Sequence, residues 1–254
     1  MSALKGLIIA FSMYSKIPTP FISLKREDMK YHLIFFPWVG AVIAGIIYLW
    51  NYIALRGHIN HLTFTLIAVA IPFLVTGGFH VDGFMDTMDA IKSYKPREEK
   101  LEILKDPHIG AFSVISLATA LLIYVGAINQ IGKIEMLVYP ISFILVRALS
   151  GIGVFVIPKA KNNGMLHTFS NNRKKYQKIV IISLIIEFII GQSIMIIIDL
   201  KTGIVLGIVS LICFIYYRYK AIKEFGGTTG DVAGFFVTYT EIVMAIAAAV
   251  CTLV

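Results

Sequence analysis

Residues 33–55 read LIFFPWVGAVIAGIIYLWNYIAL and contain no Asp, Glu, Lys or Arg. A helix of about 20 apolar residues crosses the hydrocarbon core of a bilayer, which is roughly 30 Å thick. This stretch therefore predicts a membrane-spanning helix. Six more apolar runs follow it and are expected to span as well, at about residues 62–78, 109–129, 136–158, 179–198, 203–217 and 232–254.

The composition of the whole chain indicates the same class of protein. Hydrophobic residues make up 57% of the 254 positions and charged residues only 15%, too little polar surface to cover a soluble core. We expect an all-α, polytopic membrane helix bundle of about seven transmembrane helices, forming a single domain over residues 1–254. A shorter apolar stretch, residues 4–14, is expected to lie in the interface or to re-enter the membrane.

Lys and Arg residues are distributed unevenly between the loops. They gather before the first span and in the loops after the second, fourth and sixth spans, whereas the alternate loops hold only Arg56, Lys133 and Lys201. By the positive-inside rule, the N-terminus and the basic loops lie on the cytoplasmic side of the cell membrane. This bias also explains the net charge of +8, so we expect the lipid bilayer, and no nucleic acid, as a partner.

The block TGGFHVDGFMDTMDA, residues 76–90, contains the acidic residues Asp82, Asp86 and Asp89. On a helix these three carboxylates fall within an arc of roughly 60° and repel one another near the membrane boundary. Mg²⁺ would offset that cost and leave positions for water and substrate phosphates. The alternative is that the aspartates face water or pair with nearby lysines. His80 is expected to transfer a proton or to orient a carboxylate.

Two further motifs are candidates for phosphate binding. In KDPHIGAF, residues 105–112, Asp106 before a proline either caps the next helix or joins Lys105 in an anion site at the helix N-terminus. In GGTTGD, residues 226–231, we predict a phosphate cradle built from backbone N–H groups and hydroxyls, with a simple turn as the alternative. The residues that would form the cradle are Gly226, Gly227, Thr228 and Thr229.

Charged residues also occur within or beside the predicted spans. Asp231 opens the last span and either caps it or joins the metal site. Arg147, Glu187 and Glu241 lie inside spans, where charges normally have partners in the protein interior. Arg147 is expected either to pair with a carboxylate or to hold a phosphate with two hydrogen bonds.

These motifs occur together in one known family. The sequence resembles the cobalamin synthase family, adenosylcobinamide-GDP ribazoletransferase, in blocks that run from near the start of the chain to near its end. The blocks are KIPTP (16–20), FPWVG (36–40), the acidic block (76–90), LEILKDPHIGAF (101–112), Arg147, and GGTTGDVAGF (226–235) followed by Glu241. The sequence departs from the family pattern at Ala90, where Gly is more usual, and at Pro107-His108, where Ser-Arg is more usual.

The resemblance implies an activity and roles for the motif residues. The family joins adenosylcobinamide-GDP to α-ribazole or its 5′-phosphate, which gives adenosylcobalamin or its 5′-phosphate and releases GMP. Lys105 and Arg147 would stabilise the departing GMP, and His80 or an aspartate would accept the hydroxyl proton. The Mg²⁺ ligands would be Asp82, Asp86, Asp89 and Asp231.

Two other functions, a membrane phosphotransferase of the CDP-alcohol type and a cation-coupled transporter, also use acidic residues in or beside the membrane. A CDP-alcohol phosphotransferase also uses aspartates at a membrane boundary, but its order of Asp, Gly and Arg is absent here. A cation-coupled transporter would often show internal repeats, and none is evident. The sequence leaves open the choice of ribazole or its phosphate, and whether the chain acts in a homo-oligomer or a biosynthetic complex.

Overall fold

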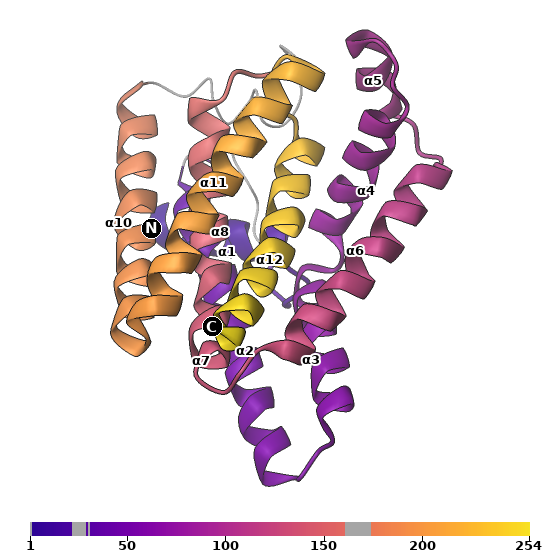
Figure 1. The fold of residues 1–254 in the computed structure, drawn as a ribbon. Coiled ribbons are helices and arrows are strands. Elements are labelled where there is room, and N and C mark those ends of the chain that lie inside the picture. The colour runs from indigo at the N-terminus through magenta and orange to yellow at the C-terminus, as the bar shows by residue number, and fades with distance from the viewer. Residues whose placement is uncertain (1, 22–28, 30, 161–173) are drawn as a thin grey trace.

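The computed structural model describes residues 2–21, 29, 31–160 and 174–254, and these ranges are built from helices (Figure 1). One isolated parallel bridge joins Lys159 to Thr228. In order, the elements are α1 (Ser2–Tyr14), η2 (His32–Phe35), α2 (Phe36–Arg56), α3 (His61–Thr76), α4 (Phe79–Lys92), α5 (Arg97–Ile103), α6 (Ala111–Gln130), α7 (Glu135–Val138), η3 (Tyr139–Ile141), α8 (Ser142–Val156), α10 (Lys174–Ile198), α11 (Leu200–Phe225) and α12 (Gly230–Leu253).

The helices confirm the predicted class of fold. Within the described ranges, six segments are long and apolar enough to cross a membrane, and α3 with α4 forms a seventh candidate that is bent by 94°. The short N-terminal stretch forms α1, which packs on η2 and α2 and buries Ile9 and Ala10 completely. The chain is therefore an all-α membrane helix bundle with six or seven spans.

Several helices differ from the predicted spans in where they begin or end, or in how they are divided. α11 continues to Phe225 instead of ending near Tyr217, because a helix can extend past the apolar segment into charged residues. The fourth span is built from three consecutive pieces, α7, η3 and α8. α6 begins at Ala111, and Gly110 is its N-cap. Hydropathy locates the membrane-crossing part of each helix but not its end.

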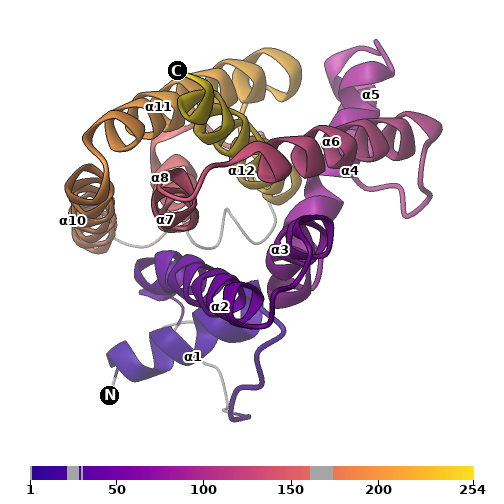
Figure 2. The same ribbon diagram turned by 60° about the horizontal axis from the view of Figure 1, so that its bottom comes forward.

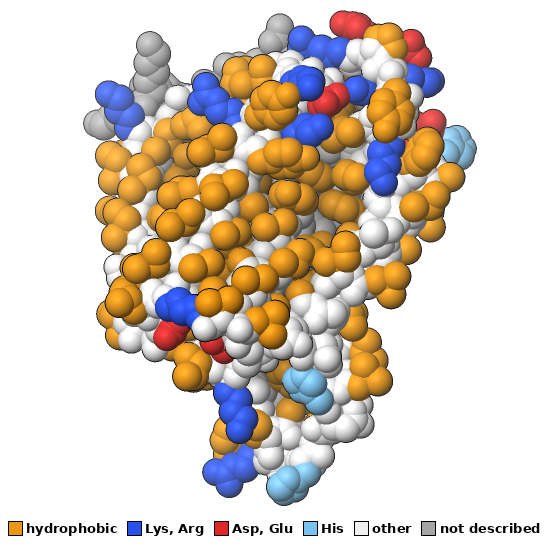
Figure 3. Space-filling view, viewed as in Figure 1, with side chains coloured by type: hydrophobic (Ala, Val, Ile, Leu, Met, Phe, Trp, Pro, Cys, Tyr) orange, Lys and Arg blue, Asp and Glu red, His pale blue; other side chains and the backbone are white. Residues whose placement is uncertain are grey.

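α8 lies at the centre of the bundle. Figure 2 shows it surrounded by α2, α10, α11 and α12, and it packs against each of them. The span that includes α8 is 83% buried inside the protein, whereas the α10 span is 17% buried. Figure 3 shows a band of hydrophobic side chains between an upper end rich in Lys and Arg and a lower end with fewer of them. This band is the surface expected to face lipid.

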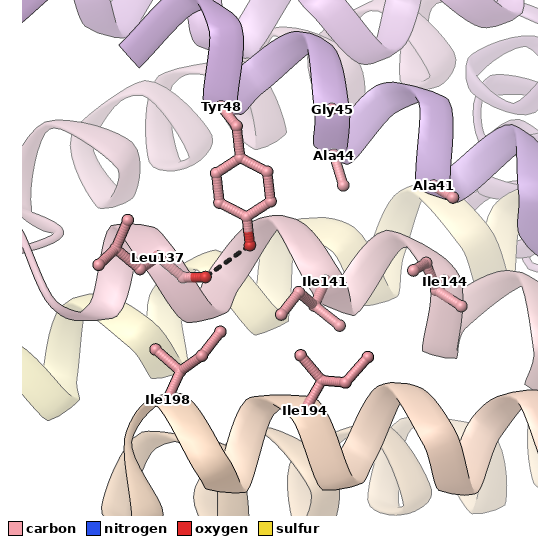
Figure 4. A pocket seen from close by; sticks show the side chains of 9 residues that line it. All are labelled: Ala41, Ala44, Gly45, Tyr48, Leu137, Ile141, Ile144, Ile194 and Ile198. Carbon is pink, nitrogen blue, oxygen red and sulfur yellow. Dashed lines mark hydrogen bonds between the residues drawn. The ribbon is translucent and has the colours of Figure 1, made fainter. Parts of the chain in front are cut away.

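Small residues on α2 set its distance from α8. A Cβ on Gly40 would overlap the Phe143 carbonyl group, so the two backbones touch there. Five residues later, Gly45 has open space around it and lines an apolar groove of about 520 Å³ with Ala41 and Ala44 (Figure 4). Tyr48 donates a hydrogen bond to the Leu137 carbonyl oxygen at 2.6 Å within this groove.

These two glycines on one helix give a matched test of the packing. Gly40→Ala should destabilise the protein by about 1–3 kcal/mol, because backbone atoms of α8 would have to move. Gly45→Ala should leave stability unchanged or slightly raised, because alanine favours helix and meets no neighbour. Thermal unfolding in detergent measures both, and equal melting temperatures for the two variants would contradict the described α2–α8 contact.

Candidate active site

A pair of glycines separates the acidic helix from the span before it. Gly77 (φ 68°) ends α3 and Gly78 (φ 80°) precedes α4, and both adopt the left-handed conformation that side chains disfavour. The Lys16 side chain lies against Gly77, and the Lys16 N–H donates to the Val75 carbonyl oxygen at 2.8 Å. The chain therefore turns sharply at the glycine pair, and α4 leaves in a new direction.

α4 packs closely against α12. A Cβ on Gly83 would lie 2.6 Å from the Asp231 carbonyl oxygen, and one on Gly234 would lie 3.3 Å from the His80 carbonyl oxygen. Beside this crossing, the rings of Phe84 and Phe235 stack with their centroids 5.8 Å apart. Glycines at 83 and 234 therefore allow the backbones to approach, and they bring the start of α12 to the acidic face of α4.

The crossing gathers the four aspartates that were predicted as metal ligands. Charges on Asp82, Asp89 and Asp231 all repel a charge on Asp86. Asp82 is exposed, and the other three are partly buried. Asp82, Asp86 and Asp89 therefore share one helix with Asp231 of α12 close by, and their role as metal ligands stays a prediction.

The arrangement is not a preformed metal cage. Within the described ranges, no group of three or more His, Cys, Asp or Glu side chains is placed to enclose an ion. Mg²⁺, however, keeps several waters and usually binds through one or two carboxylates together with substrate phosphates. A partly open cluster of carboxylate oxygens fits that mode of binding.

Asp89 also meets the start of α6. A Cβ on Gly110, the N-cap of α6, would overlap the Asp89 carboxylate, so that carboxylate lies against the first turn of the helix. A negative charge is favourable there because of the helix dipole. The helix N-terminus that was predicted to receive a phosphate therefore faces an aspartate of the acidic face.

Lys105 and Asp106 are exposed side chains in the turn before α6. Asp106 accepts a hydrogen bond from the His108 backbone N–H at 3.0 Å, which with the His108 side chain lowers the pKa of Asp106. Lys105 pairs with Glu102 at 2.6 Å. The capping role weighed for Asp106, with Pro107 at the first helical position, is wrong because the helix starts later, at Ala111.

The Gly226–Asp231 loop is tightly fixed by its own side chains. Gly226 (φ 72°) ends α11, and its N–H donates to the Ile222 carbonyl oxygen at 2.9 Å. The Thr228 hydroxyl is buried and lies 2.5 Å from the Tyr217 hydroxyl, whereas Thr229 caps α12 by accepting from the Val232 N–H at 3.2 Å. Both hydroxyls predicted to contact phosphate thus hold the loop in shape.

The segment after α8 contributes to the same loop, which the sequence did not reveal. The Thr228 N–H donates to the Pro158 carbonyl oxygen at 2.7 Å, and the Ala160 N–H donates to the Thr228 carbonyl oxygen at 3.2 Å. Gly227 lies against this segment, since a Cβ there would lie 2.5 Å from the Lys159 carbonyl carbon. The Lys159 ammonium group donates to the Val154 carbonyl oxygen, and burial lowers the pKa of Lys159 to about 8.

Arg97 contacts the loop from the other side. Its Nε donates to the Phe225 carbonyl oxygen at 2.9 Å, and a Cβ on Gly226 would overlap its guanidinium group. In the sequence, Arg97 belongs to a basic loop that was used only to assign orientation. A contact between residues so far apart in the chain leaves no local pattern that could have identified it.

Arg147 and His80 lie inside the bundle. Arg147 is 0% exposed and donates from Nη1 to Glu241 at 2.8 Å and to the Phe143 carbonyl oxygen at 3.0 Å. The sequence left two roles open for Arg147, pairing with a carboxylate or binding a phosphate, and in the structure it pairs with the Glu241 carboxylate. His80 is 5% exposed, and its ring centroid lies 5.6 Å from that of Phe36 and 5.5 Å from that of Phe79.

The Arg147–Glu241 pair should be far more important for stability than an exposed pair. Glu241→Ala would leave a buried guanidinium group without its carboxylate and should cost about 3–5 kcal/mol. Glu102→Ala removes the exposed partner of Lys105 and should cost less than about 1 kcal/mol. Thermal unfolding of the two variants compares them, and an equally small loss for both would contradict the buried pair.

Comparisons with known proteins agree with these features. The chain matches the cobalamin-5-phosphate synthase family over residues 6–249. An adenosylcobinamide-GDP ribazoletransferase of Lachnoclostridium phytofermentans is 41% identical, over 97% of this chain and 94% of its own length. A protein of the same name from Clostridium botulinum (strain Alaska E43 / Type E3) is 32% identical, over 94% of this chain and 94% of its own length. Another, from Clostridioides difficile, is 30% identical, over 94% of this chain and 95% of its own length. No solved structure matches. With the predicted motifs and near-complete coverage in agreement, the chain belongs to the cobalamin-5-phosphate synthase family.

Proposed function

We propose that this protein is an adenosylcobinamide-GDP ribazoletransferase, which joins its GDP-activated substrate to α-ribazole or α-ribazole 5′-phosphate and releases GMP. The observation that carries the proposal is the gathering of four aspartates at the α4–α12 crossing, beside the Gly226–Asp231 loop. The relatives described above are named adenosylcobinamide-GDP ribazoletransferase, which supports the proposal. An acidic cluster of this kind suits a substrate that contains a pyrophosphate and arrives with a divalent cation.

The proposed reaction is a displacement at phosphorus. A ribazole hydroxyl oxygen forms a bond to the phosphorus on the cobinamide side, and the bond from that phosphorus to the bridging oxygen breaks. GMP departs with the electron pair, and the hydroxyl proton passes to a base. We assign the base to an aspartate of the cluster rather than to His80, because His80 is buried beside aromatic rings whereas Asp82 is exposed.

Asp82, Asp86, Asp89 and Asp231 would hold Mg²⁺ in this proposal. When bound, Mg²⁺ would neutralise charge on the transferred and departing phosphate groups. The aspartates themselves orient the ion and the nucleophile, and the glycine contacts at Gly83 and Gly110 fix their positions. Because Arg147 is engaged with Glu241, its role is to stabilise the bundle around the site rather than to bind the departing GMP.

The site is proposed to face the cytoplasm. Figure 3 shows one end of the bundle rich in Lys and Arg, and this end holds α5 and the C-terminal end of α11. Arg56, Lys133 and Lys201 lie elsewhere, at the end of α2, between α6 and α7, and in the first turn of α11. From the positive-inside rule we infer that the aspartates, the Gly226–Asp231 loop and the N-terminus lie on the cytoplasmic side of the cell membrane. The GDP-activated substrate and the ribazole acceptor would both be bound on that side.

Substitution of the aspartates tests the assignment. Asp82→Asn, Asp86→Asn and Asp89→Asn should each lower kcat by about 100-fold or more, because each removes a carboxylate that would hold the Mg²⁺ that neutralises the reacting phosphates. Asp199→Asn is the matched control, because Asp199 caps α11 at the opposite end and asparagine also caps helices. GMP release from adenosylcobinamide-GDP with α-ribazole measures the effect.

Metal removal belongs to the same assay. Chelation with EDTA should abolish GMP release, and added Mg²⁺ should restore it. Activity that persists in the triple asparagine variant, or in the presence of excess EDTA, would refute the metal assignment. Release of CMP from a CDP-alcohol, with no GMP release, would instead support the alternative phosphotransferase.

The contact between Asp89 and Gly110 gives a separate prediction. Gly110→Ala should displace the Asp89 carboxylate and lower kcat by about tenfold or more, because misplacement of a positioning group slows the reaction. Gly126→Ala on the same helix is the control, since that glycine has open space around it. Equal turnover by these two variants would show that the position of Asp89 is not critical.

A further inference from the structure

Among the described residues, four lysines on or near α5 and α11 pair with carboxylates, whereas Arg97 pairs with none. Lys100 and Lys220 both pair with Glu224, at 2.6 and 3.4 Å. Lys95 pairs with Glu99 at 3.3 Å, and Lys105 is held by Glu102. Among the described residues, no carboxylate lies within ion-pair distance of Arg97, whose side chain is exposed. None of the described carboxylates therefore forms an ion pair with its guanidinium group.

Two contacts fix the orientation of the Arg97 side chain. Nε donates to the Phe225 carbonyl oxygen at 2.9 Å, which anchors the guanidinium group at the end of α11. The guanidinium group rests on Gly226, where any side chain would overlap it. With Nε engaged, the Nη1 and Nη2 groups form a fork that matches two oxygens of a phosphate group.

The Gly226–Asp231 loop, which Arg97 contacts at Gly226, ends at Asp231 of the aspartate cluster. Gly226 ends α11, and Asp231 lies in the first turn of α12, against Gly83 of the acidic helix. A diphosphate held by a cation at the aspartates has one phosphate to be transferred and one that departs with the guanosine. The departing phosphate carries increasing negative charge, so a fixed cation beside the loop would stabilise it.

We propose that Arg97 is a phosphate-binding residue of this site, and that it holds the phosphate of the guanosine nucleotide, in the substrate and in the GMP that departs. This inference rests on the proposed transferase function and extends it to a residue outside the predicted motifs. It also assigns a role to Gly226, which is to leave space for the guanidinium group as well as to end α11.

Binding of GMP and of guanosine to the purified wild-type protein and its variants, measured by isothermal titration calorimetry in detergent, tests the proposal. Arg97→Ala should weaken GMP binding about tenfold or more, because a charge-assisted pair of hydrogen bonds is lost. Guanosine, which lacks the phosphate, should bind equally to wild type and variant. A purely structural role for Arg97 would weaken both ligands alike, and that result would overturn the proposal.

Four further variants guard against a folding defect. Arg97→Lys keeps the charge but loses the fork, and should show an intermediate loss of GMP binding. Gly226→Ala keeps the arginine but displaces it, and should reproduce the loss. The double variant Gly226→Ala with Arg97→Ala should bind GMP no more weakly than Arg97→Ala alone. Lys95→Ala, which removes an exposed cation paired with Glu99, should bind GMP as wild type does.

The outcomes separate this inference from the proposed function. If wild type releases GMP from adenosylcobinamide-GDP but Arg97→Ala binds GMP normally, the role of Arg97 is wrong and the transferase function stands. If wild type neither binds GMP nor turns over the substrate, both proposals are wrong. A larger loss for Lys95→Ala than for Arg97→Ala would also contradict the assignment.

Discussion

Repulsion between four carboxylates at one helix crossing is the constraint on which the rest of the site depends. The crossing forms because Gly83 and Gly234 let the backbones of α4 and α12 approach, which brings Asp231 to Asp82, Asp86 and Asp89. Such a concentration of charge is costly near the membrane boundary unless a cation offsets it. The cluster lies beside the Gly226–Asp231 loop, at the same end of the bundle as α5 and the C-terminal end of α11, where Lys and Arg gather (Figure 3).

The surrounding bundle holds this arrangement in place. α8 packs against four long helices, and its Arg147 forms a buried pair with Glu241 of α12. α12 therefore contacts the acidic helix at one end and the central pair further along its length. The Gly226–Asp231 loop is in turn fixed by Thr228, which hydrogen-bonds to the segment after α8. A displacement of α12 would disturb the central ion pair and the aspartates together.

Sequence patterns predicted those features that depend on local spacing. Long apolar runs identified the spans, and the offsets between Asp82, Asp86 and Asp89 placed them on one face, because helical geometry fixes both. Contacts between distant segments were not predictable, as with Arg97 on Gly226 and Pro158 beside Thr228. Residues expected to contact phosphate, such as Thr228, were found to stabilise the loop because hydroxyls serve either purpose.

Direct observation of the cation tests the central claim most closely. Mn²⁺ binds at oxygen sites that accept Mg²⁺, and electron paramagnetic resonance measures free and bound Mn²⁺ in a protein sample. The account predicts saturable Mn²⁺ binding that Mg²⁺ displaces, that GMP strengthens, and that is lost when Asp86 and Asp231 are both changed to asparagine. Mn²⁺ binding that is absent from the wild type, or unchanged in the double variant, would contradict it.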